Sequence, residues 1–176
     1  EFGLPDKEFK IKSFPGQLLE YYLGRLYIAK DSVLWFTDPL AFNTIDTRKN
    51  FIQFQSNIVM VRAVDDGLYV SDKNYTYYLS GQSPKDFVSR KVFDYPAIQW
   101  TDISIDGFSI NSQYSGGICA GMNQGQVRNL TDKEYAMPEG ITEGACMIRL
   151  DETKQFVASF NGTGTPLEII TKEIIG

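Results

Sequence analysis

Residues 26–38 read LYIAKDSVLWFTD, and residues 68–80, which start 42 positions further along, read LYVSDKNYTYYLS. Each stretch has a short run of β-forming residues, a polar turn built from Lys, Asp, Ser or Asn, and a second run rich in aromatic residues. This order is typical of two antiparallel strands joined by a tight hairpin, because aromatic and β-branched residues favour strands and short polar residues favour turns. The sequence therefore predicts the same hairpin twice.

A further apolar run precedes each hairpin, at residues 18–22 and 58–61, so the repeating unit has at least three strands. Weaker copies follow, and in the four units the small residue just before the turn is Ala29, Ser71, Ala120 and Ala158. A period of about forty residues with three or four strands is typical of a β-propeller blade. We therefore predict an all-β chain that is a β-propeller, or part of one, with about four blade-like antiparallel units. A β-sandwich, which is also built from hairpins, is the alternative.

The 176 residues are predicted to form a single β-propeller-type domain, 1–176, with enough chain to bury a substantial core. The blade-like units are expected at about residues 16–56, 57–93, 101–137 and 140–175. Four blades without neighbours would leave blade faces uncovered, so we expect either a fragment of a longer propeller or a partner that completes it. The first residues carry no signal-peptide pattern, and no apolar stretch is long enough to span a bilayer.

Several shorter elements are expected around these hairpins. The alternating residues 8–14 predict a half-exposed strand, which could be the outer strand of a preceding blade. Residues 51–54 and 87–93 are predicted as the outer strands of the first and second units, and residues 166–175 as a last strand. Residues 83–87 and 131–134 each have the composition of a single helical turn. The glycines of 116–117 and 121–125 are interpreted as turn glycines, because they match no phosphate-binding pattern.

The composition excludes several classes of function. The net charge of −5 and the pI near 4.8 argue against a general nucleic-acid binder, since phosphate neutralisation requires clustered Lys and Arg. The densest basic pairs, Arg48-Lys49 and Arg90-Lys91, are interpreted as solvated strand edges. The chain has no histidine, which excludes Ser-His-Asp and Cys-His catalytic systems and any histidine metal site within it.

Carboxylate chemistry is the remaining catalytic option. Aspartates that could pair in space as a glycosidase acid and base are Asp65, Asp66, Asp102, Asp106 and Asp151. Most of them lie where turns are predicted, and Asp in a turn usually bonds its own backbone. We therefore expect no enzyme, and we assign no catalytic, cofactor-binding or metal-binding residue and no cofactor. No spaced Asp-x-Asp-x-Asp-Gly loop signals calcium.

Two cysteines, Cys119 and Cys146, lie in apolar runs and are expected to be reduced and buried, although the sequence leaves their pairing open. Three Asn-x-Ser/Thr matches begin at Asn74, Asn129 and Asn161, and they are interpreted as incidental. Aromatic side chains could form a sugar-stacking or partner-binding surface, but most are expected to fill the space between blades. These aromatic residues are Tyr21, Tyr22, Trp35, Tyr75, Tyr77 and Tyr78.

Several runs of the chain resemble virion structural proteins of tailed bacteriophages. The runs are residues 16–29, 33–36, 58–71, 78–87 and 125–131, and the resemblance covers roughly residues 15 to 160. The organisation is also similar to that of the propeller proteins that close the head-to-tail channel and stabilise packaged DNA. The resemblance implies a blade-forming lineage located in the virion, and it carries no functional residue over to this chain.

From these observations we expect a non-enzymatic structural and assembly module of a phage virion, in the tail or the head-to-tail connector, that acts as a rigid protein-docking platform. Its partners would be other virion proteins, within an oligomer or a larger assembly, with no sequence-specific nucleic acid and no membrane. The alternative is an extracellular carbohydrate-binding or glycoside-cleaving propeller that recognises a host surface. A sugar reader would show exposed aromatic residues and a carboxylate pair lining a central pocket.

Overall fold

The computed structural model of the chain describes residues 10–105, 108–113, 117–131, 141–150, 153–161 and 169–173, and it describes side chains over 10–104 and 117–131. The regular secondary structure of these residues is almost entirely β-strand. Within these ranges the only helical turns are η2 (Pro84–Asp86) and η3 (Asn123–Gly125), both of the 3-10 type. The all-β prediction is therefore confirmed.

The strands form four antiparallel sheets in chain order. The first sheet contains β2 (Leu18–Tyr22), β3 (Arg25–Lys30), β4 (Val33–Phe36) and β6 (Phe51–Gln53). The second sheet contains β7 (Ile58–Val64), β8 (Gly67–Asp72), β9 (Thr76–Ser80) and β10 (Val88–Phe93). The third sheet contains β11 (Ile103–Ile105), β12 (Phe108–Gln113), β13 (Gly117–Gly121) and β14 (Val127–Asn129). The fourth sheet contains β15 (Ile141–Leu150), β16 (Thr153–Asn161) and β17 (Ile169–Glu173).

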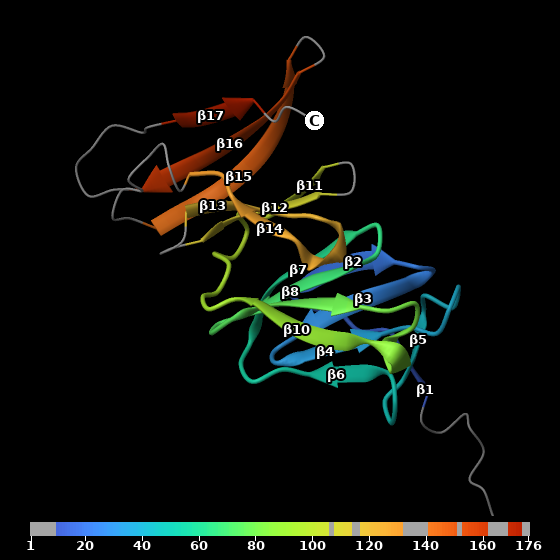
Figure 1. Cartoon of the computed structure of the whole chain (residues 1–176). Helices are drawn as coiled ribbons and strands as arrows, with labels where there is room; N and C mark the ends of the chain where they lie inside the picture. The colour runs from blue at the N-terminus through green and yellow to red at the C-terminus, as the bar shows by residue number, and fades with distance from the viewer. Residues whose placement is uncertain are drawn as a thin grey trace, which may run out of the picture.

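The sheets follow one another in space as well as in sequence (Figure 1). Strand β2 contacts β7, β7 contacts β11 and β12, and both of these contact β15. The leading strands of consecutive sheets are therefore neighbours, while the last strands of the first three sheets lie at the sheet edges. Consecutive antiparallel meanders placed side by side around their first strands are the blades of a β-propeller, which confirms the predicted fold class.

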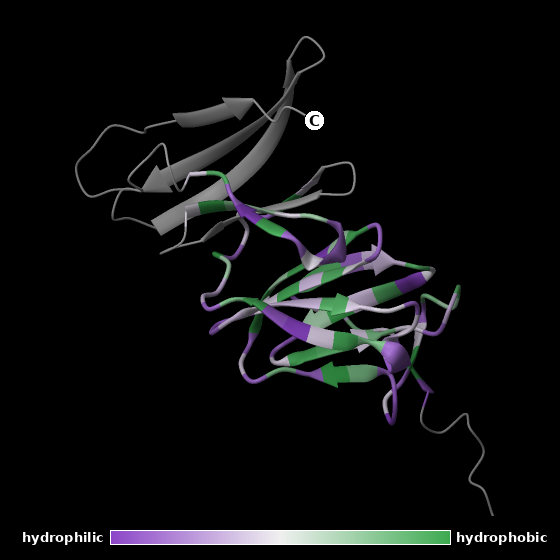
Figure 2. Ribbon diagram, in the orientation of Figure 1, coloured by the Kyte–Doolittle hydropathy of each residue, from purple (hydrophilic) through white to green (hydrophobic). Residues whose placement is uncertain are grey.

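The best-defined core lies between the first two sheets. Cross-strand register places Leu18, Ala29, Leu34 and Ile52 in one row on the face of the first sheet that meets the second. Leu34 and Leu68 are fully buried, one on each side of this contact. Full burial of a side chain of this size contributes about 1.5–3 kcal/mol to folding. Figure 2 shows the many hydrophobic residues along these strands.

One small sheet lies outside the four-sheet pattern. Strand β1 (Lys10–Lys12) pairs with β5 (Thr44–Asp46), which the chain inserts between β4 and β6. The expectation that residues 8–14 form the outer strand of a preceding blade is therefore wrong. The pairing places Ile11 opposite Ile45, whose side chain is fully buried, so burial within this chain decides the partner of β1.

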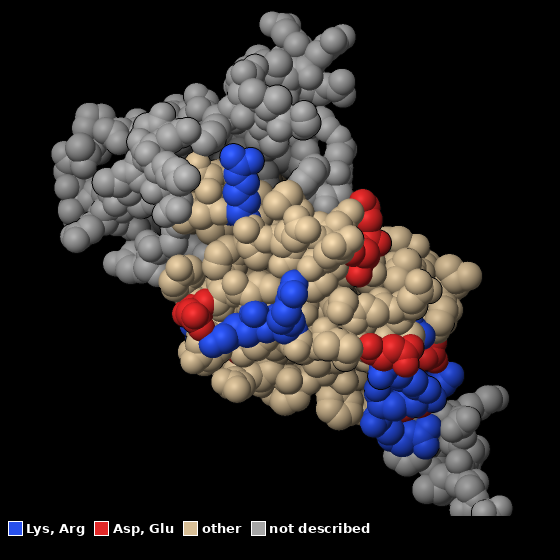
Figure 3. Space-filling view, viewed as in Figure 1, with Lys and Arg blue, Asp and Glu red and all other residues tan. Residues whose placement is uncertain are grey.

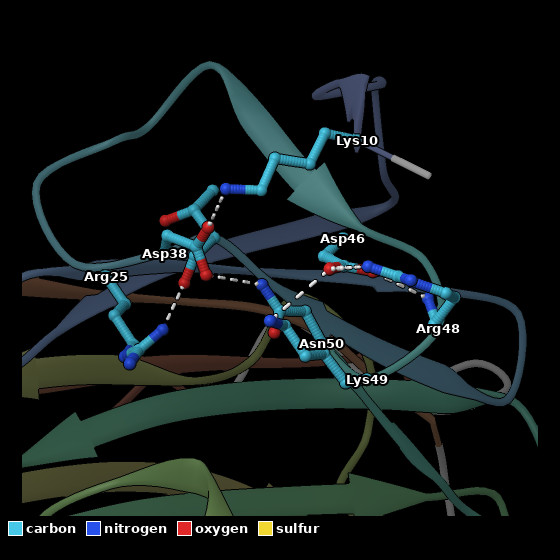
Figure 4. A network of polar contacts seen from close by, with 8 residues as sticks. Lys10, Arg25, Asp38, Asp46, Arg48, Lys49 and Asn50 are labelled. Atoms are coloured by element: carbon cyan, nitrogen blue, oxygen red, sulfur yellow. Dashed lines mark hydrogen bonds and ion pairs between the residues drawn. The ribbon is translucent and has the colours of Figure 1, made fainter. Parts of the chain in front are cut away.

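The end of β5 is held by a buried carboxylate (Figure 4). The Asp46 side chain is inaccessible to solvent and lies 3.0 Å from Nη2 of Arg48 and 3.4 Å from Nζ of Lys49. It also accepts a hydrogen bond from the backbone N–H of Arg48 at 3.1 Å. The hydrogen bonds from Arg48 hold the pKa of this carboxyl well below its usual range.

A second carboxylate ties the same corner to the first sheet. Asp38 lies 3.2 Å from Nζ of Lys10 and accepts a hydrogen bond from Nδ2 of Asn50 at 2.9 Å. The Asn50 hydrogen bond, with help from Lys10, lowers the pKa of Asp38. The β1–β5 pair is thus fastened to the loops that connect β4 to β6.

The predicted connecting elements agree with the structure in most places. Turn η2 falls within residues 83–87, and β6, β10 and β17 fall within the strands expected at 51–54, 87–93 and 166–175. The helical turn expected at 131–134 lies largely outside the described residues. The interpretation of the glycines in 116–117 and 121–125 as turn residues is wrong for Gly117 and Gly121, which begin and end β13. A Cβ at Gly121 would lie 2.7 Å from the Tyr69 ring, so close packing between the second and third sheets requires glycine.

Candidate docking surface

The first sheet has a second apolar face, directed away from the second sheet. Cross-strand register places Leu19, Ile28, Trp35 and Phe51 in one row on it. Phe14 packs edge-on against Trp35, with ring centroids 5.6 Å apart, and covers that part of the face. Leu19, at the other end of the row, is 60% exposed. Part of an apolar sheet face is therefore left open to solvent.

The uncovered part, here called the open patch, consists of large apolar side chains at and beside β2. Its members are Leu19, Tyr21, Leu23, Leu40 and Phe42, each at least 40% exposed. They are contiguous: the rings of Tyr21 and Phe42 meet with centroids 6.1 Å apart. The backbone N–H of Leu40 donates to the carbonyl of Gly24, beside Leu23, at 2.8 Å. Contiguous exposed apolar surface on a protein of this kind typically marks an interaction site.

Two leucines of the open patch are in a backbone conformation that leucine avoids. Leu23 has φ 44°, and Leu40 has φ 57°, both in the left-handed region. That region costs a residue with a Cβ about 1–2 kcal/mol, and such positions usually hold Gly, Asn or Asp. Leu40 is 78% exposed, so burial within this chain does not compensate for the strain. These leucines therefore lie at the surface at a cost in backbone strain that destabilises the folded chain.

A depression of about 300 Å³ adjoins the open patch where the leading strands of the first three sheets converge. Tyr21 and Leu23 belong to both features. The residues lining the depression are Glu20, Tyr21, Tyr22, Leu23, Ala63, Val64, Asp65 and Ser104. A partner seated on the open patch would therefore have a recess beside it that reaches toward the contact between sheets.

Three charged side chains from three different sheets meet beside this depression. Arg62 on β7 lies with Nε 2.5 Å from Oδ2 of Asp102, just before β11, and with Nη1 3.1 Å from Oε2 of Glu20 on β2. Burial raises the pKa of both Glu20 and Asp102, and the guanidinium between them opposes this effect. The single guanidinium forms ion pairs with both carboxylates and joins the first three sheets.

The aspartates considered as catalytic candidates have separate partners. The Asp65 carboxylate accepts a hydrogen bond from Nδ2 of Asn123 at 3.1 Å. Asp66 accepts one from the Tyr78 hydroxyl at 2.5 Å and one from the backbone N–H of Gln124 at 2.8 Å. Both thus hold turn η3 of the third sheet against the second sheet. Asp106 and Asp151 lie outside the described residues.

The carboxylate closest to Asp102 in this arrangement is Glu20, which the sequence analysis did not single out. Glu20 alternates with apolar residues on a predicted strand, and a charge at such a position usually faces solvent. Here its side chain is only 15% exposed, because it lies on the face that meets the second sheet. There it forms an ion pair with Arg62. Glu20 lies on the same face of its strand as the core residues Leu18 and Tyr22, and this position is the signal that could have indicated a buried ion pair.

Of the six aromatic residues noted in the sequence, Tyr22, Tyr77 and Tyr78 pack in or against the cores between sheets, as expected. Trp35 and Tyr75 are half-buried, and Trp35 lies on the outward face of the first sheet. Tyr21 is 55% exposed and lies in the open patch. The sequence analysis did not identify Leu23 and Leu40. A Leu-Gly hairpin turn, where Asn-Gly would be ordinary, is the signal that could have identified Leu23.

The remaining predicted residues contribute no chemistry to this surface. Cys119 is fully buried on β13, and Cys146 lies on β15, outside the residues whose side chains are described. Asn74 is exposed in the turn after β8, while Asn129 on β14 accepts hydrogen bonds from Thr131. Asn161 is the last residue of β16. Among the described residues, no group of three or more Cys, Asp or Glu could hold a metal ion, and no helix could cross a membrane.

Basic side chains gather beside β1 and β5, with acidic ones next to them (Figure 3). Lys10 pairs with Asp38, two residues before Leu40, and Lys12 lies opposite Thr44, two residues after Phe42. Arg48 and Lys49 follow β5 and are 40% and 51% exposed. The open patch therefore has an apolar centre and a basic rim, the usual anatomy of a protein interface.

Comparison with known proteins gave few matches. No family model matches the chain, and no curated protein matches it. A similar solved structure is the crystal structure of the N-terminal domain of Nup159, at 17% sequence identity and a TM-score of 0.47. The match covers 97% of this chain and 48% of that one, so the chain spans about half the length of the structure it matches.

Proposed function

We propose that this chain is a non-enzymatic β-propeller module that serves as a rigid protein-docking platform. The open patch is the observation that carries the proposal. Its five side chains lie on or beside a strand that is paired into a four-stranded sheet, so they are held in place before any partner arrives. A preorganised apolar surface loses little conformational entropy on binding.

The assembly to which it belongs is, on this proposal, the virion of a tailed bacteriophage, in the tail or the head-to-tail connector. The sequence resemblance over residues 16–29, 33–36, 58–71, 78–87 and 125–131 supports this placement. The partners would then be other virion proteins. A platform built of sheets that contact their sequence neighbours is stiff, which suits a structural joint.

Sugar recognition is less well supported by the same residues. It would require exposed aromatic rings beside carboxylates that are free to bind hydroxyl groups. Tyr21 does line the depression, but its neighbour Glu20 is paired with Arg62, and Asp65 is bonded to Asn123. The charge and the hydrogen-bonding capacity of these carboxylates are already engaged within the chain.

A crosslinking experiment in assembled particles tests the proposal. A photoreactive amino acid is placed at Leu19, in the open patch, and in a matched control at Val88, which is 66% exposed on β10 and outside the patch. We expect the Leu19 variant, irradiated in purified virions, to form an adduct with a virion protein that the Val88 variant does not form. Absence of the chain from the particles, or equal adducts from both positions, would overturn the proposal.

A further inference from the structure

We infer that the open patch receives the fourth sheet of a second copy of this chain, in a head-to-tail arrangement. This inference rests on the proposed function, since it names the partner of the same patch. The first sheet and the fourth sheet stand at opposite ends of the row of blade-like sheets, and within the described residues only the small β1–β5 sheet adjoins the first one besides its neighbour in the row. If the fourth sheet of one copy packed against the first sheet of another, the two sheets would lie side by side as consecutive sheets do within one chain.

The chemistry of the open patch suits a sheet as its occupant. The face that meets the second sheet carries Leu18, Ala29, Leu34 and Ile52 in one cross-strand row, and a sheet covers it. The opposite face has a similar row in Leu19, Ile28, Trp35 and Phe51, of which Leu19 and Phe51 are exposed while Ile28 is buried and Trp35 packs against Phe14. Two faces of one sheet with the same kind of apolar row are matched by the same kind of partner, because strand pleating sets the spacing of the side chains on both.

The distribution of charge favours the fourth sheet over a second open patch. Residues 10–56, which form the first sheet and its basic rim, contain six Lys and Arg against four Asp and Glu. Residues 105–176, which include the third and fourth sheets, contain five Lys and Arg against nine Asp and Glu. The two ends of the row thus carry opposite net charge. Head-to-tail contact brings opposite charges together, whereas contact between two open patches would bring two basic rims together.

The geometry has a consequence for assembly size. A head-to-tail contact uses two different surfaces of each copy, so it closes into a ring or continues as a filament, depending on the rotation between copies. In either form every copy but the terminal ones has its open patch covered. Leu23 and Leu40 would then be buried by the neighbouring copy, which would compensate for their left-handed backbone.

The test begins with light scattering on the purified 176-residue chain from about 1 to about 100 μM, where interfaces of moderate affinity dissociate. We expect a mass of at least two copies that falls toward the monomer on dilution and at high salt, because salt screens the attraction between the two ends. Leu19→Glu should weaken this self-association at least tenfold, an effect of the size seen at the centre of interfaces. The matched control Val88→Glu, at an equally exposed strand position outside the patch, should leave it unchanged.

Mixing separates head-to-tail contact from a symmetric one. The Leu19→Glu chain keeps its fourth sheet, so it should still bind the intact patch of the wild-type chain. Its own altered patch should accept no further copy, so the assembly should end at that chain. A symmetric patch-to-patch contact predicts no such capture. Failure of capture, a monomer at every concentration, or equal effects of Leu19→Glu and Val88→Glu would each overturn the inference.

The outcomes also distinguish this inference from the proposed function. A monomeric chain whose Leu19 position still crosslinks to a different virion protein overturns head-to-tail association and leaves the docking platform standing. A chain that self-associates as described but is absent from virions overturns the placement in a virion and leaves the head-to-tail contact standing. Both variants should give the same far-UV circular dichroism spectrum as the wild type. This control shows that neither result comes from an unfolded variant.

Discussion

At the scale of single residues, Tyr69 joins the second and third sheets through both its ring and its hydroxyl. Its side chain is 2% exposed, and its ring lies against Gly121 of β13. Its hydroxyl lies 2.6 Å from the Met122 carbonyl oxygen and 2.8 Å from that of Gln126, so its single proton is shared between these two acceptors. The Gln126 carbonyl also accepts from the Met122 N–H, at 2.8 Å.

Replacement of Tyr69 by Phe should lower the free energy of unfolding by about 1–2 kcal/mol, because it leaves a buried carbonyl without its donor. Urea denaturation followed by tryptophan fluorescence measures this. The control is Tyr77→Phe, whose hydroxyl makes no hydrogen bond within the part of the chain that the structure describes. Equal losses in the two variants would mean that the Tyr69 hydroxyl does not hold the turn.

Asp46 should make stability depend on pH in a defined direction. Its pKa is lower in the folded chain than in the unfolded one, so its ionised form stabilises the fold above the unfolded pKa and this contribution is lost as the pH falls through the folded value. Asp46→Asn keeps an acceptor for the Arg48 N–H but removes the charge. We expect the wild type to be more stable than Asp46→Asn at pH 7, and the gap to shrink below about pH 4.

Equilibrium denaturation of both chains at a series of pH values measures that gap. A gap that stays constant from neutral to acidic pH would show that the ion pairs of Asp46 with Arg48 and Lys49 contribute nothing beyond the hydrogen bond that Asn preserves.

At the scale of elements, the turn of the β2–β3 hairpin contains a strained residue, Leu23, whose apolar side chain is exposed. Its two turn residues, Leu23 and Gly24, both have positive φ, at 44° and 76°, as in a type I′ turn. Asparagine is the ordinary first residue of such a turn. Leu23→Asn should therefore raise the free energy of unfolding by about 0.5–1 kcal/mol and weaken docking at the open patch.

The matched variant is Leu23→Ala, which removes the apolar side chain but keeps a Cβ in the same conformation. It should weaken docking as Leu23→Asn does, without the gain in stability. Thermal unfolding and the light-scattering assay measure the two effects separately. A Leu23→Asn chain that is less stable than the wild type would mean that the leucine contributes to the fold.

The same elements show what the sequence can and cannot predict. The hairpins β3–β4 and β8–β9 follow from local patterns, because a polar turn between two β-forming runs acts over a dozen residues. Strand β5 is not predictable in this way, since Thr44-Ile45-Asp46 is too short to show alternation and pairs with a strand more than thirty residues earlier. The open patch cannot be predicted from the sequence for a related reason. Hydrophobicity predicts that Leu19 and Tyr21 are buried, and only the arrangement of whole sheets decides which face lacks a neighbour.

At the scale of the whole molecule, the triad of Glu20, Arg62 and Asp102 joins three sheets through one guanidinium. Arg62→Met keeps much of the aliphatic length but leaves two largely buried carboxylates facing each other without a cation. Breaking a pair of this kind costs about 3 kcal/mol, so we expect a loss of that size in the free energy of unfolding.

Neutralising the carboxylates provides the control. The triple variant Arg62→Met, Glu20→Gln, Asp102→Asn removes all three charges, and it should recover most of the stability that the single variant loses. Chemical denaturation of the wild type and both variants measures this. If the triple variant is no more stable than Arg62→Met, then contacts of the Arg62 side chain other than its ion pairs hold the sheets together.

The order of the sheets also bears on how the chain is made. Consecutive sheets begin about forty residues apart, so at 5–20 residues per second a ribosome delivers one roughly every 2–8 s. The first sheet emerges before the second one, which covers only the face of Leu34. On the other face Phe14 covers Trp35, but the open patch around Leu19 stays exposed throughout synthesis, when neighbouring ribosomes on one message hold several nascent chains close together. The basic residues beside it, Lys10, Lys12, Arg48 and Lys49, then act as a safeguard, because two newborn first sheets repel each other before either has an acidic end to attract.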